Sequence, residues 1–254
     1  MNNNILISII TVNYNGADYL DRLFDGVKKI IDLYDCIEHI IIDGASTDSS
    51  LKKIKHYANK SKNIIYISEK DNGIYDAMNK GITIANGRFI LHINSDDEVQ
   101  VGKDWNELID ILKKNILALL VVTRVPLIEN NAIVRTLPSR PINNLHKNFG
   151  YHFPHQGTLF NKLTFKKYGK YPVNIGYIAD KIYAYKLLDQ LNSKDIIYTD
   201  LSISVQNLGG VSSSNLSAPL KTAYLTFINR NKYSYKYPVM RILGNLFFKS
   251  LFKN

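Results

Sequence analysis

Short apolar runs alternate with stretches of helical periodicity over the first 100 residues. Runs of strand length span residues 5–12, 37–43, 63–69 and 89–93. After the first run, one helical face is predicted to carry Leu20, Leu23, Phe24, Val27, Ile30 and Ile31. Strands that alternate with helices of this length predict βαβ units and a parallel, doubly wound sheet. Because these strands are apolar on both faces, we expect a layer of helices on each side of the sheet.

The pattern is less regular after residue 99. Helices are predicted at 104–115 and from about residue 178, and strands at 116–125, 132–137 and 195–207, the last as one long strand or a pair. Pro138, Pro141 and Pro154 punctuate the intervening region. The order of elements in this half is therefore predicted, but the path of the backbone is not.

Each of the four apolar runs ends in polar residues. The segments TVNYN, DGASTD, EKDNG and NSDD supply Asn15, Asp43, Asp71, Asp96 and Asp97. All four ends lie on the carboxyl edge of a parallel sheet, where open α/β sheets bind ligands. One such end is an ordinary turn, since Asn, Ser and Asp favour turns. Four of them together indicate a site.

The adjacent carboxylates of Asp96 and Asp97 are the candidates for metal chemistry. They are hard oxygen ligands, which suit Mg²⁺ or Mn²⁺, and such a cation in turn suits a diphosphate. The first turn, NYNGAD, lacks the G-x-G-x-x-G of a dinucleotide-binding dehydrogenase, and the chain has no G-x-x-x-x-G-K-S/T phosphate loop. What remains is a nucleotide site read by side chains, in which a metal holds the phosphates.

Four motifs, in this order and spacing, resemble family 2 glycosyltransferases of the GT-A fold. They are SIITVNYNGADYL, IIIDGASTDSS, DNGIYDAMNKGITIANGRFI and HINSDDEV. The similarity is greatest to bacterial enzymes that build surface polysaccharides such as O-antigen, capsule and exopolysaccharide. It implies a GT-A-like α/β fold, a doubly wound, mostly parallel sheet flanked by helices. The implied catalytic domain is 1–215, with a nucleotide-binding half (1–100) and an acceptor-binding half (101–215).

The resemblance also implies a reaction and roles for residues at the strand ends. A sugar would pass from a nucleotide diphosphate sugar, a UDP-sugar by family habit, to an acceptor hydroxyl, with inversion and with a metal cofactor. Thr11, Asn13 and Tyr14 would line the nucleobase and ribose pocket, Asp43 would accept a hydrogen bond from the base, and Asp71 and Gly73 would border the same pocket.

The metal motif departs from the family pattern. The family's Asp-x-Asp resembles NSD here, so an amide, Asn94, stands where the first carboxylate is usual. We therefore expect Asp96 and Asp97 to share the metal and ribose contacts, with Mn²⁺ or Mg²⁺ as cofactor and Asn94 in a secondary role.

The acceptor hydroxyl needs a base as it attacks. The family places an Asp at the start of a helix after the irregular region, and IGYIADKIYAYKLL matches, so Asp180 is the candidate. The alternative is a carboxylate that only interacts with the helix dipole. His155 is expected to contact the diphosphate, the acceptor or the metal, or else to be a hydrogen-bonded structural histidine. Residues 206–215 resemble a loop that closes over the diphosphate, although Gly and Ser also make linkers.

The net charge of +10 is concentrated at the C-terminal end of the chain. Residues 201–254 hold seven basic residues and no acidic one, and the tail 216–254 reads as a basic amphipathic segment. We expect it to bind an anionic membrane surface, with a helix packed on the catalytic domain as the alternative. No nucleic-acid motif is present. No apolar run reaches the ~18 residues of a spanning helix.

With the resemblance, this tail favours a peripheral enzyme at the inner, cytoplasmic face of the bacterial plasma membrane. The acceptor would then be a lipid-linked, undecaprenyl-diphosphate type of surface glycan. Two other readings stay open. A sugar nucleotidyltransferase would need a basic, Gly-rich phosphate loop, which NYNGAD does not provide. A non-catalytic scaffold with a decayed site is favoured by Asn94 but disfavoured by the retained carboxylates Asp43, Asp96, Asp97 and Asp180.

Overall fold

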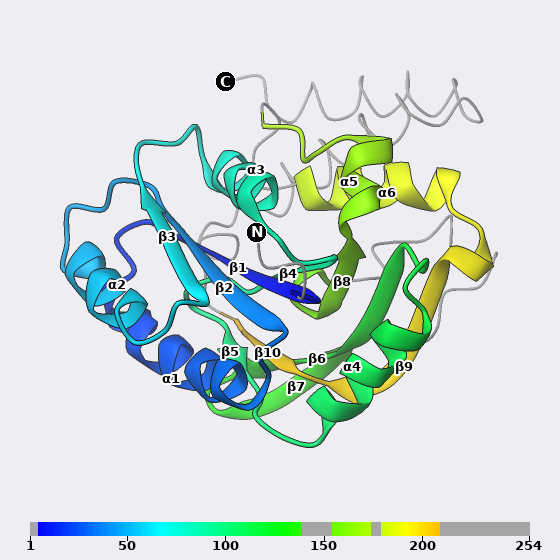
Figure 1. Cartoon of the computed structure of the whole chain (residues 1–254), viewed down its shortest axis with the longest axis horizontal. Coiled ribbons are helices and arrows are strands. Elements are labelled where there is room, and N and C mark those ends of the chain that lie inside the picture. The colour runs from blue at the N-terminus through cyan, green and yellow to red at the C-terminus, as the bar shows by residue number, and fades with distance from the viewer. Residues whose placement is uncertain (1–4, 139–153, 174–178, 209–254) are drawn as a thin grey trace, which may run out of the picture.

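The computed structural model describes residues 5–138, 154–173 and 179–208, which are organised around one curved sheet (Figure 1). Four parallel strands in the order β3–β2–β1–β4 form its first half. These are β1 (Ile7–Asn13), β2 (Ile37–Asp43), β3 (Ile64–Ser68) and β4 (Phe89–His92). The register pairs Asn13 with Asp43 and Asp43 with Ser68, so the carboxyl ends of these strands lie side by side. The predicted parallel half is confirmed.

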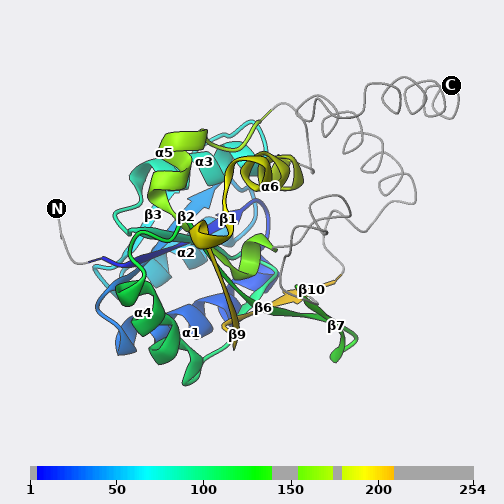
Figure 2. The same ribbon diagram turned by 90° about the vertical axis from the view of Figure 1, so that its right-hand side faces the viewer.

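The second half of the sheet assembles on one long strand, β6 (Leu120–Glu129). Its first residues pair with β8 (Thr158–Asn161) and β9 (Ile196–Ser202), and its last residues pair with β7 (Ala132–Leu137) and β10 (Ser204–Asn207). β8 runs antiparallel to both β4 and β6 and so joins the two halves, while the short β5 (Glu98–Val99) pairs with β10. Figure 2 shows the β6–β7 hairpin projecting from the body of the domain.

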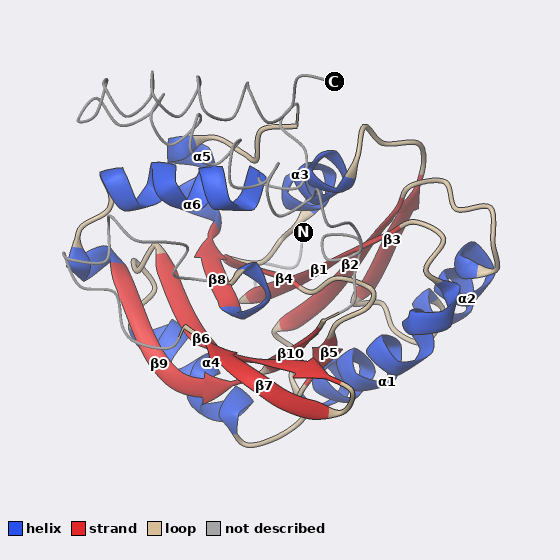
Figure 3. Ribbon diagram, turned by 180° about the vertical axis from the view of Figure 1, so that it is seen from behind, coloured by secondary structure: helices blue, strands red, loops and turns tan. Residues whose placement is uncertain are grey.

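Helices cover both faces of the sheet, as the apolar strands predicted. One layer holds α1 (Ala17–Leu33), α2 (Ser50–Ala58) and α4 (Asp104–Lys114), and the other holds α3 (Ile74–Ile84), α5 (Lys162–Tyr168) and α6 (Ala179–Gln190) (Figure 3). All six apolar positions predicted for the first helix are buried. Each layer encloses its own hydrophobic core, one around Leu23 and Trp105 and the other around Met78 and Tyr183.

The region around Pro154 is more regular than its sequence indicates. A 3₁₀ turn, η2 (His155–Gly157), leads into β8 and α5, neither of which was predicted. Both are too short to display a hydrophobic period. The segment predicted as one strand or a pair, 195–207, forms the pair β9 and β10, which follow a second turn, η4 (Ser193–Asp195). The helix expected from about residue 178 is α6.

Some predicted features lie outside the described residues. These are the basic tail, 216–254, and the greater part of the proposed closing loop, 206–215. In the part of the chain that the structure describes, no helix combines the length and apolar character needed to cross a bilayer.

Buried His39, on β2, makes the stability of the fold depend on pH. Its ring is fully buried, with Nε2 2.9 Å from the Thr11 hydroxyl and Nδ1 3.0 Å from the Tyr57 hydroxyl. Burial lowers the pKa of His39 from 6.5 to about 3, so the folded protein keeps the ring neutral where the unfolded chain protonates it. This stability is fully present above pH 6.5 and is lost as the pH falls from 6.5 towards 3.

We expect His39 to reduce the free energy of unfolding by about 2 kcal/mol between pH 7 and pH 5. Urea unfolding of the wild type and of His39→Gln at both pH values measures this contribution, because Gln keeps polar ends but does not titrate. The decrease with acid should be smaller in the variant by that amount. Equal decreases in the two proteins would contradict the assignment.

Candidate active site

The carboxyl edge of the first four strands carries a buried carboxylate, Asp43, within a dense hydrogen-bond network. Its Oδ1 accepts from Asn13 Nδ2 at 2.8 Å and from the Ser46 hydroxyl at 2.5 Å, and its Oδ2 accepts from the Ser68 hydroxyl at 2.7 Å. Neither Asp43 nor Asn13 has appreciable exposure, yet the Oδ1 atom of Asn13 is buried without a hydrogen-bond partner. The structure therefore brings Asn13 and Asp43 together as one rigid unit at the base of the site.

Thr11 lies deeper than the resemblance implied. Its side chain is completely buried and pairs with His39 within the α1–α2 layer. With no exposed atom, Thr11 fixes the neighbouring strand rather than presenting a group at the surface.

The exposed Tyr14, the half-buried Asp71 and the buried Gly44 form a group that we call the Tyr14 patch. A Cβ atom added to Gly44 would lie 2.6 Å from Asp71 Oδ2 and 3.4 Å from Tyr14 Cδ2, so the three residues are in close contact. The Tyr14 ring is 67% exposed. An exposed aromatic face beside a carboxylate is suited to stacking on a nucleobase while the carboxylate accepts hydrogen bonds. Only glycine leaves room for this arrangement.

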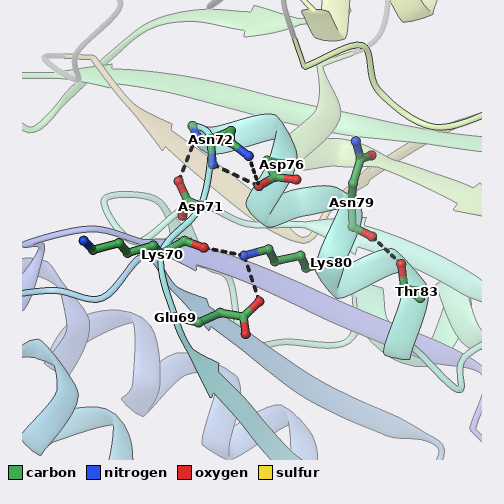
Figure 4. A network of polar contacts seen from close by, with 9 residues as sticks. Glu69, Lys70, Asp71, Asn72, Asp76, Asn79, Lys80 and Thr83 are labelled. Atoms are coloured by element: carbon green, nitrogen blue, oxygen red, sulfur yellow. Dashed lines mark hydrogen bonds and ion pairs between the residues drawn. The ribbon is translucent and has the colours of Figure 1, made fainter.

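A polar network holds the loop that carries Asp71 against α3 (Figure 4). Asp71 Oδ1 accepts from the Gly73 backbone N–H at 2.8 Å, and Gly73 caps the N-terminus of α3 with a φ of 102°, a conformation that favours glycine. Further along, Lys80 pairs with Glu69 at 2.8 Å and donates to the Lys70 carbonyl at 2.7 Å. The contacts fix the position of Asp71 relative to the first turn of α3.

The NSDD segment after β4 folds into a tight loop. Asp97 Oδ2 lies 3.3 Å from the Asn94 backbone N–H, which donates to it, and the Asp96 carbonyl accepts from Asn207 Nδ2 at 2.8 Å. A Cβ atom on Gly16 would contact both Asn13 Oδ1 and the Ser95 hydroxyl, so this loop lies against the first one. The start of the 206–215 segment is thus anchored directly on the candidate metal loop.

The carboxylates of this loop fit a divalent cation. Asp97 is 2% exposed, and burial together with the charge of Asp96 raises the pKa of Asp97 to about 7. The amide oxygen Oδ1 of Asn94 is buried and has no hydrogen-bond partner. Two carboxylates and an unsatisfied amide oxygen are an oxygen-donor set suited to Mg²⁺ or Mn²⁺.

The side chains of the described residues do not by themselves provide a full set of metal ligands. There, no group of three or more His, Cys, Asp or Glu side chains is arranged to hold a metal ion. Magnesium-type sites commonly use one or two carboxylates and take further ligands from substrate phosphates. The arrangement therefore fits a cation that arrives with a diphosphate.

His155 connects the metal loop to the candidate base. Its Nε2 lies 3.5 Å from Asn94 Nδ2, and its Nδ1 lies 3.4 Å from Asp180 Oδ2. Asp180 stands in the first turn of α6, with its side chain 13% exposed, and its Oδ1 accepts from the Tyr75 hydroxyl at 2.9 Å. Residues 86 positions apart along the chain, Asn94 and Asp180, therefore share one cluster.

The environment keeps Asp180 ionised. Burial alone would raise the pKa of this carboxyl, but the hydrogen bond and charge of His155 and the hydrogen bond from Tyr75 outweigh it and lower the pKa below its ordinary value. An ionised carboxylate that stays slightly exposed can accept a proton, so the geometry suits a general base.

Two hollows lie apart from this cluster. One cavity, of about 550 Å³, lies between α1 and α2. The other, of about 760 Å³, lies near Arg88 and Lys162, at the amino-terminal edge of the sheet, opposite the candidate site. Neither is lined by the clustered carboxylates. The candidate site is therefore located by its clustered polar side chains and not by the volume of a cavity.

Sequence reasoning missed two members of the cluster. Tyr75 was not singled out, although it lies within the GIYDAM segment that helped to establish the resemblance. Gln156 contacts Asp97 through its side chain and follows His155 directly, so the HQ dipeptide was the available signal.

The curved, mostly parallel sheet between two helix layers, with carboxylates at its carboxyl edge, defines an α/β protein of the GT-A type. The family described as glycosyl transferase family 2 matches residues 8–177, well over half of the chain. The chain belongs to this family.

Curated relatives match shorter segments. An uncharacterised glycosyltransferase of Escherichia coli, YibD, is 30% identical over 99 residues, which cover 39% of this chain and 28% of that protein. The dolichyl-phosphate β-glucosyltransferase of Dictyostelium discoideum is 31% identical over 144 residues, covering 52% and 44% respectively. The match thus spans less than half the length of each of these relatives.

Solved structures share the fold over almost the whole chain. Residues 1–349 of Staphylococcus aureus TarS, in complex with UDP-GlcNAc, superpose with a TM-score of 0.72 at 15% identity, covering 95% of this chain and 70% of that one. The mannosyltransferase PcManGT of Pyrobaculum calidifontis, in complex with GDP-Man and Mn²⁺, gives 0.65 at 14% identity, covering 94% and 69%. At this identity the likeness shows the fold alone.

Proposed function

We propose that this protein is an inverting, metal-dependent glycosyltransferase that uses a nucleotide diphosphate sugar. The observation that carries the proposal is the single cluster of Asn94, His155 and Asp180 beside the Asp96–Asp97 pair, at the carboxyl edge of a family 2 sheet. Structural neighbours bound to UDP-GlcNAc and to GDP-Man with Mn²⁺ support the donor class.

The proposed reaction is one displacement at the anomeric carbon of the donor sugar. The acceptor oxygen forms a bond to this carbon while the bond from the carbon to the diphosphate oxygen breaks. The acceptor proton passes to the Asp180 carboxylate, and the nucleoside diphosphate leaves with the electron pair of the broken bond.

The nucleobase and the diphosphate of the donor would contact different parts of the carboxyl edge of the sheet. The nucleobase would stack on the Tyr14 patch, with Asn13, Asp43 and Gly73 shaping its surroundings. Asp96 and Asp97, with Asn94 Oδ1, would hold Mn²⁺ or Mg²⁺, which when bound neutralises charge on the departing diphosphate. His155 would orient Asp180 and face the diphosphate.

The finer assignment is a UDP-sugar donor and a lipid-linked acceptor in surface glycan synthesis, such as O-antigen or other lipopolysaccharide. The basic tail, 216–254, supports a peripheral location at the inner face of the plasma membrane, because cations near an anionic surface are each attracted by about 1 kcal/mol. An undecaprenyl-diphosphate-linked glycan would be presented at that surface.

Thermal unfolding of the full chain with UDP, GDP and dTDP, each with and without Mn²⁺, tests the proposal. With ligand at about 100 times its Kd, UDP and Mn²⁺ together should raise the Tm by roughly 5–10 °C. Gly44→Ala places a methyl group against Asp71 and Tyr14 and should remove most of this rise.

The matched control is Gly102→Ala. A Cβ atom there meets nothing within 4 Å, so the nucleotide response should equal that of the wild type. No response to any nucleotide would contradict the proposal and favour a non-catalytic scaffold. Release of pyrophosphate rather than nucleoside diphosphate would favour a nucleotidyltransferase.

A further inference from the structure

The hydroxyl of Tyr75 makes a contact that the reaction described above does not yet use. Tyr75 is the second residue of α3, and its hydroxyl donates to Asp180 Oδ1 at 2.9 Å across 105 positions of sequence. The side chain is buried, with 7% exposure, and its ring packs on Tyr171 at a centroid distance of 5.6 Å. Burial, with the negative charge of Asp180, raises the pKa of Tyr75 well above its ordinary value, so the hydroxyl remains a donor.

Asp180 is held from two directions. Tyr75 donates to Oδ1 from the α3 side, and His155 approaches Oδ2 from η2 at 3.4 Å. A carboxylate offers about four lone-pair positions, and Asp180 also accepts from the Lys181 backbone N–H, so three contacts hold its plane and leave a position free for an incoming proton. Tyr75 and His155 are the two side chains among these partners and help to set the direction in which that position points.

The turn that carries Tyr75 also carries part of the candidate nucleotide site. Asp71 caps the Gly73 N–H, and Asp71 contacts Gly44 in the Tyr14 patch, while Tyr75 lies only two residues beyond Gly73. One short segment of backbone therefore spans the distance between the nucleotide-facing carboxylate and the partner of Asp180.

We propose that Tyr75 is a positioning residue for sugar transfer, whose hydroxyl aims the Asp180 carboxylate at the acceptor hydroxyl. This inference rests on the proposed function, in which Asp180 is the base. Because the first turn of α3 also carries the Asp71 loop, the nucleotide site and the base are placed by the same structural element.

Tyr75→Phe tests the role, since it removes the hydroxyl and keeps the ring. We expect kcat for sugar transfer to fall by about 10- to 100-fold, the size of effect that misplacing a catalytic group produces. The KM for the donor and the Kd for the nucleoside diphosphate should stay within about twofold of the wild type, as expected when a group acts on the chemical step alone. In an Asp180→Asn background the same change should cost nothing further, because the base is already absent.

The neighbouring Tyr171 provides the matched control. Its hydroxyl is buried and has no hydrogen-bond partner, so Tyr171→Phe removes a similar group from the same aromatic cluster without removing a hydrogen bond to Asp180. Its kcat should stay within about twofold of the wild type. Equal losses in the two Phe variants would show that losing any hydroxyl from this aromatic cluster has the same effect, whether or not it donates to Asp180, and would overturn the inference.

Other outcomes separate the inference from the function on which it rests. If Tyr75→Phe keeps the wild-type kcat while Asp180→Asn loses activity, the positioning role is wrong and the proposed function stands. If the wild type turns over no nucleotide sugar, the proposed function fails and the inference fails with it. Urea unfolding of both Phe variants confirms that the comparison is between folded proteins.

Discussion

Replacing Asp180 with Asn is expected to lower kcat for sugar transfer by about 10²- to 10⁴-fold, the usual contribution of a positioned general base. The amide keeps the size of the carboxylate and can still accept from Tyr75, but it cannot take the acceptor proton. The Kd for the nucleoside diphosphate should stay within about twofold, because the side-chain partners of Asp180 are Tyr75 and His155 and no residue of the Tyr14 patch. Initial rates of nucleoside diphosphate release, with and without acceptor, measure the effect.

Asp110→Asn is a suitable control for this change. Asp110 is exposed on α4, in the opposite helix layer, so the variant removes the same charge without entering the cluster. Its kcat should match the wild type. If Asp180→Asn retained more than about a third of the wild-type kcat, Asp180 would be a structural carboxylate at a helix N-terminus and the base would have to be another residue.

The polar strand ends could be predicted to meet because parallel strands share one edge. Asn13 and Asp43 come from different strands, and the register places them opposite one another with a 2.8 Å hydrogen bond. Asp71 follows the third strand and contacts Gly44 after the second. Neighbouring parallel strands fix such contacts to within a residue, so the sequence alone was sufficient to predict that these side chains meet.

The direction of individual side chains was harder to predict. Thr11 belongs to the same motif as Asn13 and Tyr14, but its hydroxyl is buried against His39 while the Tyr14 ring is exposed. Alternation along a strand shows that Thr11 and Asn13 share a face. It does not show how far the covering helices extend, and that depth decides which side chain reaches the surface.

Contacts between the halves of the chain could not be predicted. The Tyr75–Asp180 hydrogen bond depends on where α6 lies against α3, and that position depends in part on β8, a strand of four residues with no readable period. His155 was a candidate from the sequence, but its place between Asn94 and Asp180 required the structure. Long-range packing is therefore the part of the site that the sequence left open.

Replacing Asp97 with Asn is expected to lower kcat/KM for the donor by about 10²-fold or more, since a metal-bound diphosphate is stabilised by several kcal/mol. The buried carboxylate lies beside Asp96, and the amide would remove one of the two anionic ligands that we propose for the metal. The Mn²⁺-dependent part of the UDP-induced Tm rise should disappear. Titration of Mn²⁺ into protein and UDP, followed by calorimetry, measures the loss directly.

The same variant should not weaken the fold of the metal-free protein. Burial and the charge of Asp96 raise the pKa of Asp97 to about 7, so the fold disfavours its ionised form, and Asp97→Asn removes this penalty. The urea midpoint without metal should therefore be equal or higher at pH 7 and above. Asp35→Asn, at an exposed position before β2, should leave both activity and Mn²⁺ binding unchanged. A stable Asp97→Asn protein with wild-type Mn²⁺ affinity would exclude Asp97 as a ligand. A protein with raised stability and lost metal binding would identify Asp97 as a residue kept for function at the expense of stability.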